Sequence, residues 1–247
     1  VIAVAVARQR DLEQADVLCD GGDYERAAAT YAKALGASEG TSDDARAGLE
    51  DTQLGEESWQ AFVSTLVQEA DEQTGSAASR SFLRAARIAR RFGSASAEEL
   101  FARAYDSSPL ERQVAAMYEG MLVASERGAD LIELQRAFLE RQGAKARAVA
   151  SFRFGSRWAT RHQQLETAAT FFEEAVSQDP TKDSALHFLK ELYGVRDGNW
   201  DQALGLLERA ASSSAPSAFA VASAGLTAWK QQGNLLRARA WFEKLAQ

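Results

Sequence analysis

The sequence feature that most constrains this chain is an alanine that returns at a fixed interval. In each of five segments an alanine is followed four positions later by a large apolar residue, and in four of them by a second alanine three positions after that. The five leading alanines are Ala27, Ala97, Ala168, Ala203 and Ala238. Their separations of 70, 71, 35 and 35 residues predict a 35-residue repeat with two weaker copies in the longer gaps.

The spacing inside each copy is that of an α-helix, because residues three and four apart lie on the same helical face. We expect this helix to be the second of a hairpin, with its alanines allowing close approach to the first helix. The large residue, such as Phe101, Phe172 or Phe242, would be buried between the two helices. The turn signals before these helices are Gly22-Asp23, Gly198-Asn199 and Gly233-Asn234, and the prolines near their ends are Pro109, Pro180 and Pro216.

An amphipathic first helix precedes these turns. Its clearest example carries Leu186 and Leu189 on one face. A glycine inside a helix costs about 1 kcal/mol relative to alanine, so a mid-helix glycine predicts a place where another element crosses closely. We expect such crossings at Gly120, Gly155 and Gly225.

Composition agrees with an all-α fold. Only 3 prolines interrupt 247 residues, 46% of which are hydrophobic, and alanine, leucine, arginine and glutamate recur while β-branched runs are scarce. We expect six or seven helical hairpins and no sheet. The alternative is an irregular helical bundle in which similar faces recur by chance. The richness in alanine and arginine is typical of a protein from a GC-rich bacterium.

The small-residue and aromatic spacing, the GDY and GNW turns and the DP dipeptide after one second helix together resemble the tetratricopeptide repeat. Clear copies lie near 10–35, 80–109, 150–180, 184–215 and 218–247, and degenerate copies near 43–72 and 112–142. The resemblance implies one α-solenoid over residues 1–247, wound as a right-handed superhelix whose concave surface holds a peptide or a partner helix. The family's lysine and asparagine carboxylate clamp is not matched, so capture of a free C-terminal carboxylate is not carried over.

Charge is distributed unevenly along the chain. Residues 1–75 hold 5 basic and 16 acidic side chains, residues 76–161 hold 15 and 9, and residues 162–247 hold 8 and 10. The net charge of −7 argues against general nucleic-acid binding, although RNA binding through related helical repeats is an alternative that the arginines leave open. The basic middle predicts a protein or peptide partner with an acidic surface.

Two rows of arginines are candidate partner-binding residues. The first row is Arg80, Arg84, Arg87 and Arg91, and the second, looser row is Arg153, Arg157 and Arg161. Spacings of four, three and four put the first row on one helical stripe, opposite Phe82 and Ala85. Arginine suits paired contacts with carboxylates. The plainer interpretation is a solvated helix face paired with neighbouring glutamates.

The sequence offers little from which a catalytic site could be built. It contains no nucleophile motif, phosphate-binding loop or metal-ligand spacing, and it has a single cysteine, Cys19, and two histidines, His162 and His187. We therefore expect no enzyme activity, no cofactor and no metal. The leading hypothesis is a protein-binding scaffold. The alternatives are a self-associating structural subunit and a regulatory region of a longer multidomain protein.

The first seven residues, Val1 to Ala7, are all apolar. They are too few to cross a bilayer, which needs about 20 residues. They are either the remainder of a removed signal or anchor, or the apolar end of the first helix, and we favour the helix. The chain begins without methionine, which predicts a piece of a longer protein. A cytoplasmic location is expected from the cysteine usage, although a periplasmic protein without disulfides would look the same.

Overall fold

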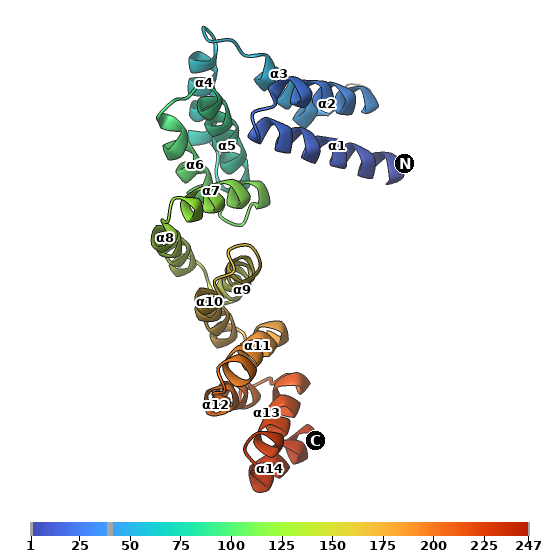
Figure 1. Cartoon of the computed structure of the whole chain (residues 1–247), viewed down its shortest axis with the longest axis vertical. Coiled ribbons are helices and arrows are strands. Elements are labelled where there is room, and N and C mark those ends of the chain that lie inside the picture. Colours follow the sequence, from blue (N-terminus) through green and yellow to red (C-terminus); the bar gives the residue numbers. More distant parts are fainter. Residues whose placement is uncertain (1, 39–41, 247) are drawn as a thin grey trace. The chain divides into compact units, whose positions relative to one another are not determined.

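The computed structural model of the chain describes residues 2–38 and 42–246 and is helical throughout (Figure 1). No β-strand occurs in this part of the chain, so the predicted all-α class is confirmed. The first seven helices are α1 (Ile2–Asp20), α2 (Tyr24–Ala37), α3 (Asp43–Gln53), α4 (Trp59–Asp71), α5 (Gly75–Arg91), α6 (Ser96–Ser107) and α7 (Arg112–Ala124). The remaining elements are α8 (Gly128–Glu140), α9 (Ala144–Thr160), α10 (Leu165–Gln178), α11 (Asp183–Lys190), the π-helix η1 (Glu191–Arg196), α12 (Trp200–Ala211), α13 (Ala218–Lys230) and α14 (Leu235–Leu245).

The helices gather into two compact units, Val1–Met121 and Leu122–Gln247. The first contains α1 to α6 and most of α7, and the second contains α8 to α14. A single solenoid over the whole chain stays a prediction.

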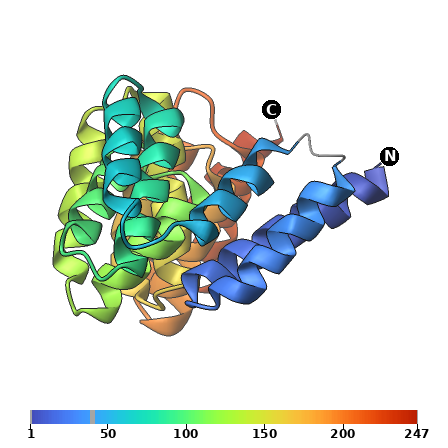
Figure 2. The ribbon, with the colours of Figure 1, turned by 90° about the horizontal axis from the view of Figure 1, so that it is seen from above.

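Helix pairs occur where the repeats are expected. Helices α1 and α2, α5 and α6, α9 and α10, and α13 and α14 pack as pairs, and α12 packs against α11 and η1. These five pairs coincide with the clear copies, whereas α3 and α4, and α7 and α8, occupy the two degenerate copies. Figure 2 shows α1 and α2 side by side along most of their length.

The repeating alanines are all buried in second helices, as predicted. Phe101 and Phe172 are also buried, with 1% and 4% of their surface exposed. The prediction that Phe242 is equally buried is wrong, because this side chain is only half-buried. Helix α14, which carries it, packs mainly against α13, so one side of the ring has less to pack against.

Two of the three mid-helix glycines mark close crossings. A Cβ atom at Gly155 would lie 3.0 Å from ring atoms of Phe172, and one at Gly225 would lie 2.7 Å from Cε1 of Phe242. In both pairs the aromatic ring therefore occupies the space that a larger residue would need. The prediction is wrong for Gly120, where an added Cβ would meet no atom within 4 Å.

The apolar beginning of the chain is helical where it is described. Residues 2–7 belong to α1, in agreement with the helical interpretation, whereas Val1 lies outside the described residues. Among the helices that the structure describes, none combines the length and the apolar character needed to span a membrane.

Candidate functional site

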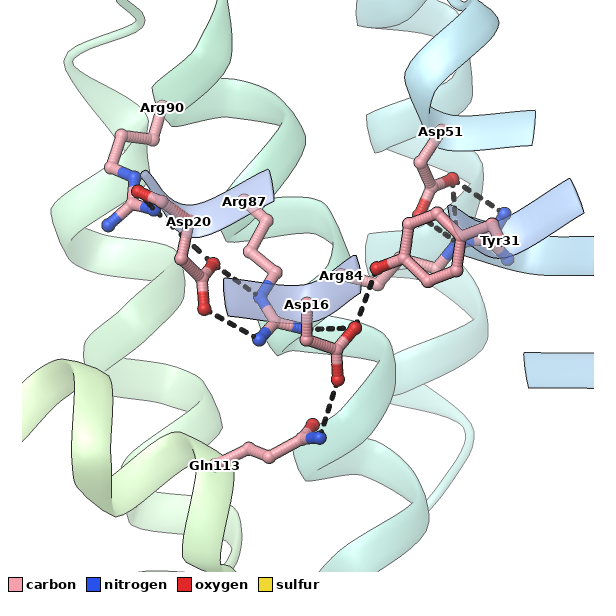
Figure 3. A network of polar contacts seen from close by, with 8 residues as sticks. All are labelled: Asp16, Asp20, Tyr31, Asp51, Arg84, Arg87, Arg90 and Gln113. Carbon is pink, nitrogen blue, oxygen red and sulfur yellow. Dashed lines mark hydrogen bonds and ion pairs between the residues drawn. The ribbon is translucent and has the colours of Figure 1, made fainter. Parts of the chain in front are cut away.

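Helix α5 presents the first arginine row opposite a buried apolar face. Phe82, Ala85 and Ala89 are buried, as expected from their helical spacing. The helix ends at Arg91, and Gly93 follows with a φ of +66°, a left-handed conformation in which glycine commonly stops a helix. Most of the arginine side chains opposite this face contact other helices of the same unit (Figure 3).

Arg84 is paired with Asp51 at the end of α3. Its Nε donates to both carboxylate oxygens at 2.8 Å, and Nη2 donates to the backbone oxygen of Ala47 at 3.2 Å. Burial raises the pKa of the Asp51 carboxyl, although the hydrogen bond and the charge of Arg84 oppose this effect. Burial lowers the pKa of the Arg84 guanidinium, but its interactions with Asp51 outweigh burial and hold that pKa above its usual value.

Arg87 lies against two carboxylates of α1. Its Nε and Nη2 each donate to Asp20 at 3.0 Å in a fork geometry, and its Nη1 lies 3.9 Å from Asp16. Burial lowers the pKa of this guanidinium, but the charges of Asp20 and Asp16 outweigh burial, and the pKa lies above its usual value. Arg87 is therefore a charged, largely enclosed group whose counter-ions come from another helix.

The two arginines that follow extend the contact. Arg90 donates to the backbone and carboxylate oxygens of Asp20 at 3.1 and 3.4 Å. Arg91 donates to the backbone oxygen of Asp51 at 2.6 Å, and its guanidinium lies 4.6 Å from the ring centre of Tyr24 in α2. Arg90 was not part of the predicted row, although it stands three positions after Arg87 and could have been found by helical spacing.

Asp16 joins this contact to two further helices. Its carboxylate accepts a hydrogen bond from the hydroxyl of Tyr31 at 2.6 Å and from the side-chain amide of Gln113 in α7 at 2.7 Å. Figure 3 shows Asp16 between these two groups and Arg87. Residues from five helices thus form one polar network. We call it the α5 network, and its members are Asp16, Asp20, Tyr31, Asp51, Arg84, Arg87, Arg90, Arg91 and Gln113.

The predicted first row is therefore not one open stripe. Arg80 is exposed and has no ion-pair partner among the described residues, whereas Arg84, Arg87 and Arg91 contact acidic residues or backbone oxygens of α1 and α3. These partners come from other helices and are mainly aspartates, although Arg84 also lies 3.5 Å from the carboxylate of Glu50 in α3. The role of the row in binding a partner stays a prediction.

The arginines of the second row, Arg153, Arg157 and Arg161, have different environments. Arg153 is exposed and lines a cavity of about 450 Å³. Arg157 is half-buried, with its guanidinium 5.0 Å from the ring centre of Phe154, and Arg161 is exposed at the end of α9. The cavity is lined by Val149, Phe152, Arg153, Thr181, Lys182, Asp183 and Ser184. The three arginines thus do not converge on one place.

The two histidines each lie beside an aromatic ring. His187 is exposed, 6.1 Å from the ring of Phe219, and His162 lies 4.9 Å from the ring of Trp158. Within residues 2–38 and 42–246, no group of three histidine, cysteine or acidic side chains is placed to hold a metal ion. Cys19 is a half-buried free thiol, and burial raises its pKa to about 11. Comparison of the sequence with protein-family models and with curated proteins gives no match.

Proposed function

We propose that this chain is a non-catalytic protein-binding scaffold, built as an α-solenoid of tetratricopeptide-like hairpins. The observation that carries the proposal is a repeated packing of a first-helix glycine against a second-helix aromatic ring. Gly155 meets Phe172 and Gly225 meets Phe242, and both pairs are 17 residues apart in the sequence. With the buried alanines at 35-residue intervals, this packing supports a repeat architecture. Repeat proteins bind partners along the surface of their stacked units.

The second unit offers an accessible face on its first helices. Val149 in α9 and Ser184 in α11 are 35 residues apart, are exposed and line the same cavity. Phe219 follows 35 residues later in α13, next to the ring of His187. Equivalent positions of three successive first helices are thus at or near the surface, as expected for a binding face.

The cavity residues indicate the chemistry of the partner. Arg153 is an exposed cation without an ion-pair partner in the described chain, and it adjoins the apolar side chains of Val149 and Phe152. Lys182 and Asp183 already have partners, because Lys182 pairs with Asp179 at 3.0 Å and Asp183 accepts from Ser217 at 2.5 Å. An extended segment that carries a carboxylate beside an apolar side chain fits this arrangement.

The test is a selection of peptides from a random display library on the full chain, followed by binding measurements by fluorescence anisotropy. Selected peptides should carry an acidic residue close to an apolar one. Arg153→Gln should weaken their binding about tenfold, because a hydrogen bond to a charged group contributes about 1.5–3 kcal/mol.

The matched control is Arg209→Gln, which removes the same charge from an exposed position of α12 in the same unit. Its peptide affinity should stay within about twofold of the unmodified chain, since exposed charges act weakly at a distance. Selected peptides without acidic residues, or equal losses in the two variants, would contradict the proposal.

Self-association is a second candidate, favoured by apolar side chains on the last two helices. Leu226 and Trp229 in α13 and Leu235 and Leu236 in α14 are exposed, with Leu236 84% exposed. Exposed apolar side chains that gather on a surface mark contact sites for other proteins. Sedimentation analysis over a concentration series tests this candidate. Leu236→Lys should shift any dimer toward monomer, and a chain that stays monomeric at all concentrations would exclude it.

A further inference from the structure

Helices α1 to α3 possess an apolar core of their own. The buried apolar side chains that the structure describes in these helices belong to one cluster, which consists of Leu12, Ala15, Ala27, Tyr31, Ala34 and Ala45. The half-buried side chains that pack against the cluster, Leu18, Cys19, Leu35 and Leu49, also come from α1 to α3. Burial of apolar surface therefore holds these three helices to one another without the help of α5.

The contact between these helices and α5 is of a different kind. The guanidinium groups of Arg84, Arg87, Arg90 and Arg91 contact carboxylates and backbone oxygens of α1 and α3, and Arg91 also lies over the ring of Tyr24. Such hydrogen-bonded ion pairs can be exchanged for equivalent pairs with another carboxylate, whereas interlocked apolar side chains cannot. A short connection, residues 54–58, joins α3 to α4.

The arrangement of the acidic partners defines a ligand chemistry. Asp16 and Asp20 stand one helical turn apart on α1, and Asp51 adds a third carboxylate from α3. Arg87 binds Asp20 with the two-pronged geometry that guanidinium groups use for carboxylates. A segment with several closely spaced carboxylates would satisfy the same donors.

We propose that the arginine face of α5 is a binding surface for an acidic segment of a partner protein, and that α1 to α3 cover it as an intramolecular mimic of that segment. This inference rests on the proposed function, that the chain binds acidic protein segments, and it adds a second surface with its own regulation. The partner segment displaces Asp20 and Asp51 from the arginines. We call α1 to α3 the cover. The apparent affinity for the partner segment equals the affinity of the free arginine face multiplied by the fraction of molecules in which the cover has left that face.

The first experiment weakens the cover without removing side-chain volume. In the full chain, Asp20→Asn together with Asp51→Asn should bind a fluorescein-labelled oligoglutamate peptide at least about tenfold more tightly than the unmodified chain, because the internal competitor loses the two carboxylates that are hydrogen-bonded to Arg84 and Arg87. Adding Arg84→Gln and Arg87→Gln to this variant should abolish the gain. Unchanged affinity in a variant with native circular dichroism would overturn the proposal.

The matched control, Glu25→Gln with Glu69→Gln, makes the same change in net charge at exposed positions of the same unit. It should leave oligoglutamate affinity within about twofold of the unmodified chain, since exposed charges are largely screened. A gain equal to that of the aspartate variant would mean that net charge alone governs binding, and the proposal would be wrong.

A second measurement does not depend on the aspartate variant being folded. Spin labels at Glu25→Cys in α2 and Glu99→Cys in α6, in a Cys19→Ser background, report the distance between the cover and the α5 to α6 pair by double electron–electron resonance. Both sites are exposed. Saturating oligoglutamate should lengthen and broaden this distance distribution. A distribution unchanged by bound oligoglutamate would show that the cover does not leave.

The two proposals fail separately. If peptide binding depends on Arg153 but no variant of the α5 network changes oligoglutamate binding, the second surface is wrong and the scaffold function stands. If oligoglutamate binds through Arg84 and Arg87 while Arg153→Gln has no effect, the cavity of the second unit is wrong. If no acidic peptide binds any variant, the acidic-partner function itself is wrong.

Discussion

At the scale of the residue, the ring of Phe172 in α10 packs against side chains from two other helices. The ring of Phe172 lies 5.5 Å from that of Phe152 and 4.6 Å from that of Phe188, measured between ring centres, and it also fills the space above Gly155. This ring therefore connects α9, α10 and α11. Its burial agrees with the prediction that the large residue four positions after the alanine lies between helices.

Phe172→Ala should lower the free energy of unfolding by about 3–5 kcal/mol, because removing a buried aromatic side chain leaves a cavity among rings that cannot all collapse into it. Phe242→Ala, at the equivalent but half-buried position, should cost clearly less. Chemical denaturation followed by circular dichroism measures both values. A loss below about 1 kcal/mol for Phe172→Ala would contradict the repeat frame.

Cys19 provides a pH prediction at the same scale. Burial raises the pKa of its thiol to about 11, and the nearby charge of Arg87 only partly offsets this effect. Alkylation by iodoacetamide should therefore follow a titration centred near pH 11 in the folded chain and near the ordinary thiol pKa of about 8.5 in denaturant. The folded state binds the thiol proton more tightly than the unfolded state, so stability should fall as the pH rises from the unfolded pKa toward 11. A native alkylation midpoint at the denatured value would contradict the burial of this thiol.

At the scale of the element, α5 connects two different kinds of packing. One face is apolar and packs with α4 and α6, whereas the opposite face carries the arginines that contact α1 and α3. Both faces of α5 are therefore in contact with other helices. Substitutions on the polar face should therefore affect stability as well as binding.

Arg87→Ala should destabilise the chain by about 1.5–3 kcal/mol, because it removes both hydrogen bonds that Arg87 donates to Asp20 and the positive charge opposite Asp16. The control is Arg80→Ala in the same helix, which should change stability by less than about 0.5 kcal/mol because this side chain is exposed and unpaired in the described structure. Denaturant midpoints of the two variants measure the difference. Equal effects would show that the α5 network contributes nothing to stability.

At the scale of the whole molecule, contacts gather within two units instead of spreading evenly along the chain. The α5 network belongs wholly to the first unit, and the cavity beside Arg153 belongs wholly to the second. The two candidate surfaces can therefore be perturbed independently. Substitutions in the two surfaces should also affect the unfolding of different units.

Scanning calorimetry should resolve two unfolding transitions, because cooperativity follows the clustering of contacts. Arg87→Ala should lower the transition temperature of the first unit only, and Phe172→Ala that of the second unit only. A single transition that both substitutions shift by similar amounts would show that the units unfold together.

The sequence by itself determined the helical class and the burial of the five alanines that define the predicted 35-residue frame. These features depend on spacings of three and four residues within one helix and on the small size of alanine, so they can be read without knowing how helices meet. The close crossings at Gly155 and Gly225 followed from the same local rule. The two degenerate copies stay a prediction, because α3 packs with α2 and α4 packs with α5.

Only the tertiary structure decided what the arginines contact. Arg84 and Asp51 are 33 residues apart, and Arg87 and Asp20 are 67 residues apart, so no local pattern connects them. A row of arginines has the same spacing whether it faces water, a partner or the chain's own aspartates, because spacing fixes a helical face but not what packs against it. The half-burial of Phe242 and the open space beside Gly120 have the same origin. In each case the outcome depends on which helix packs against that face.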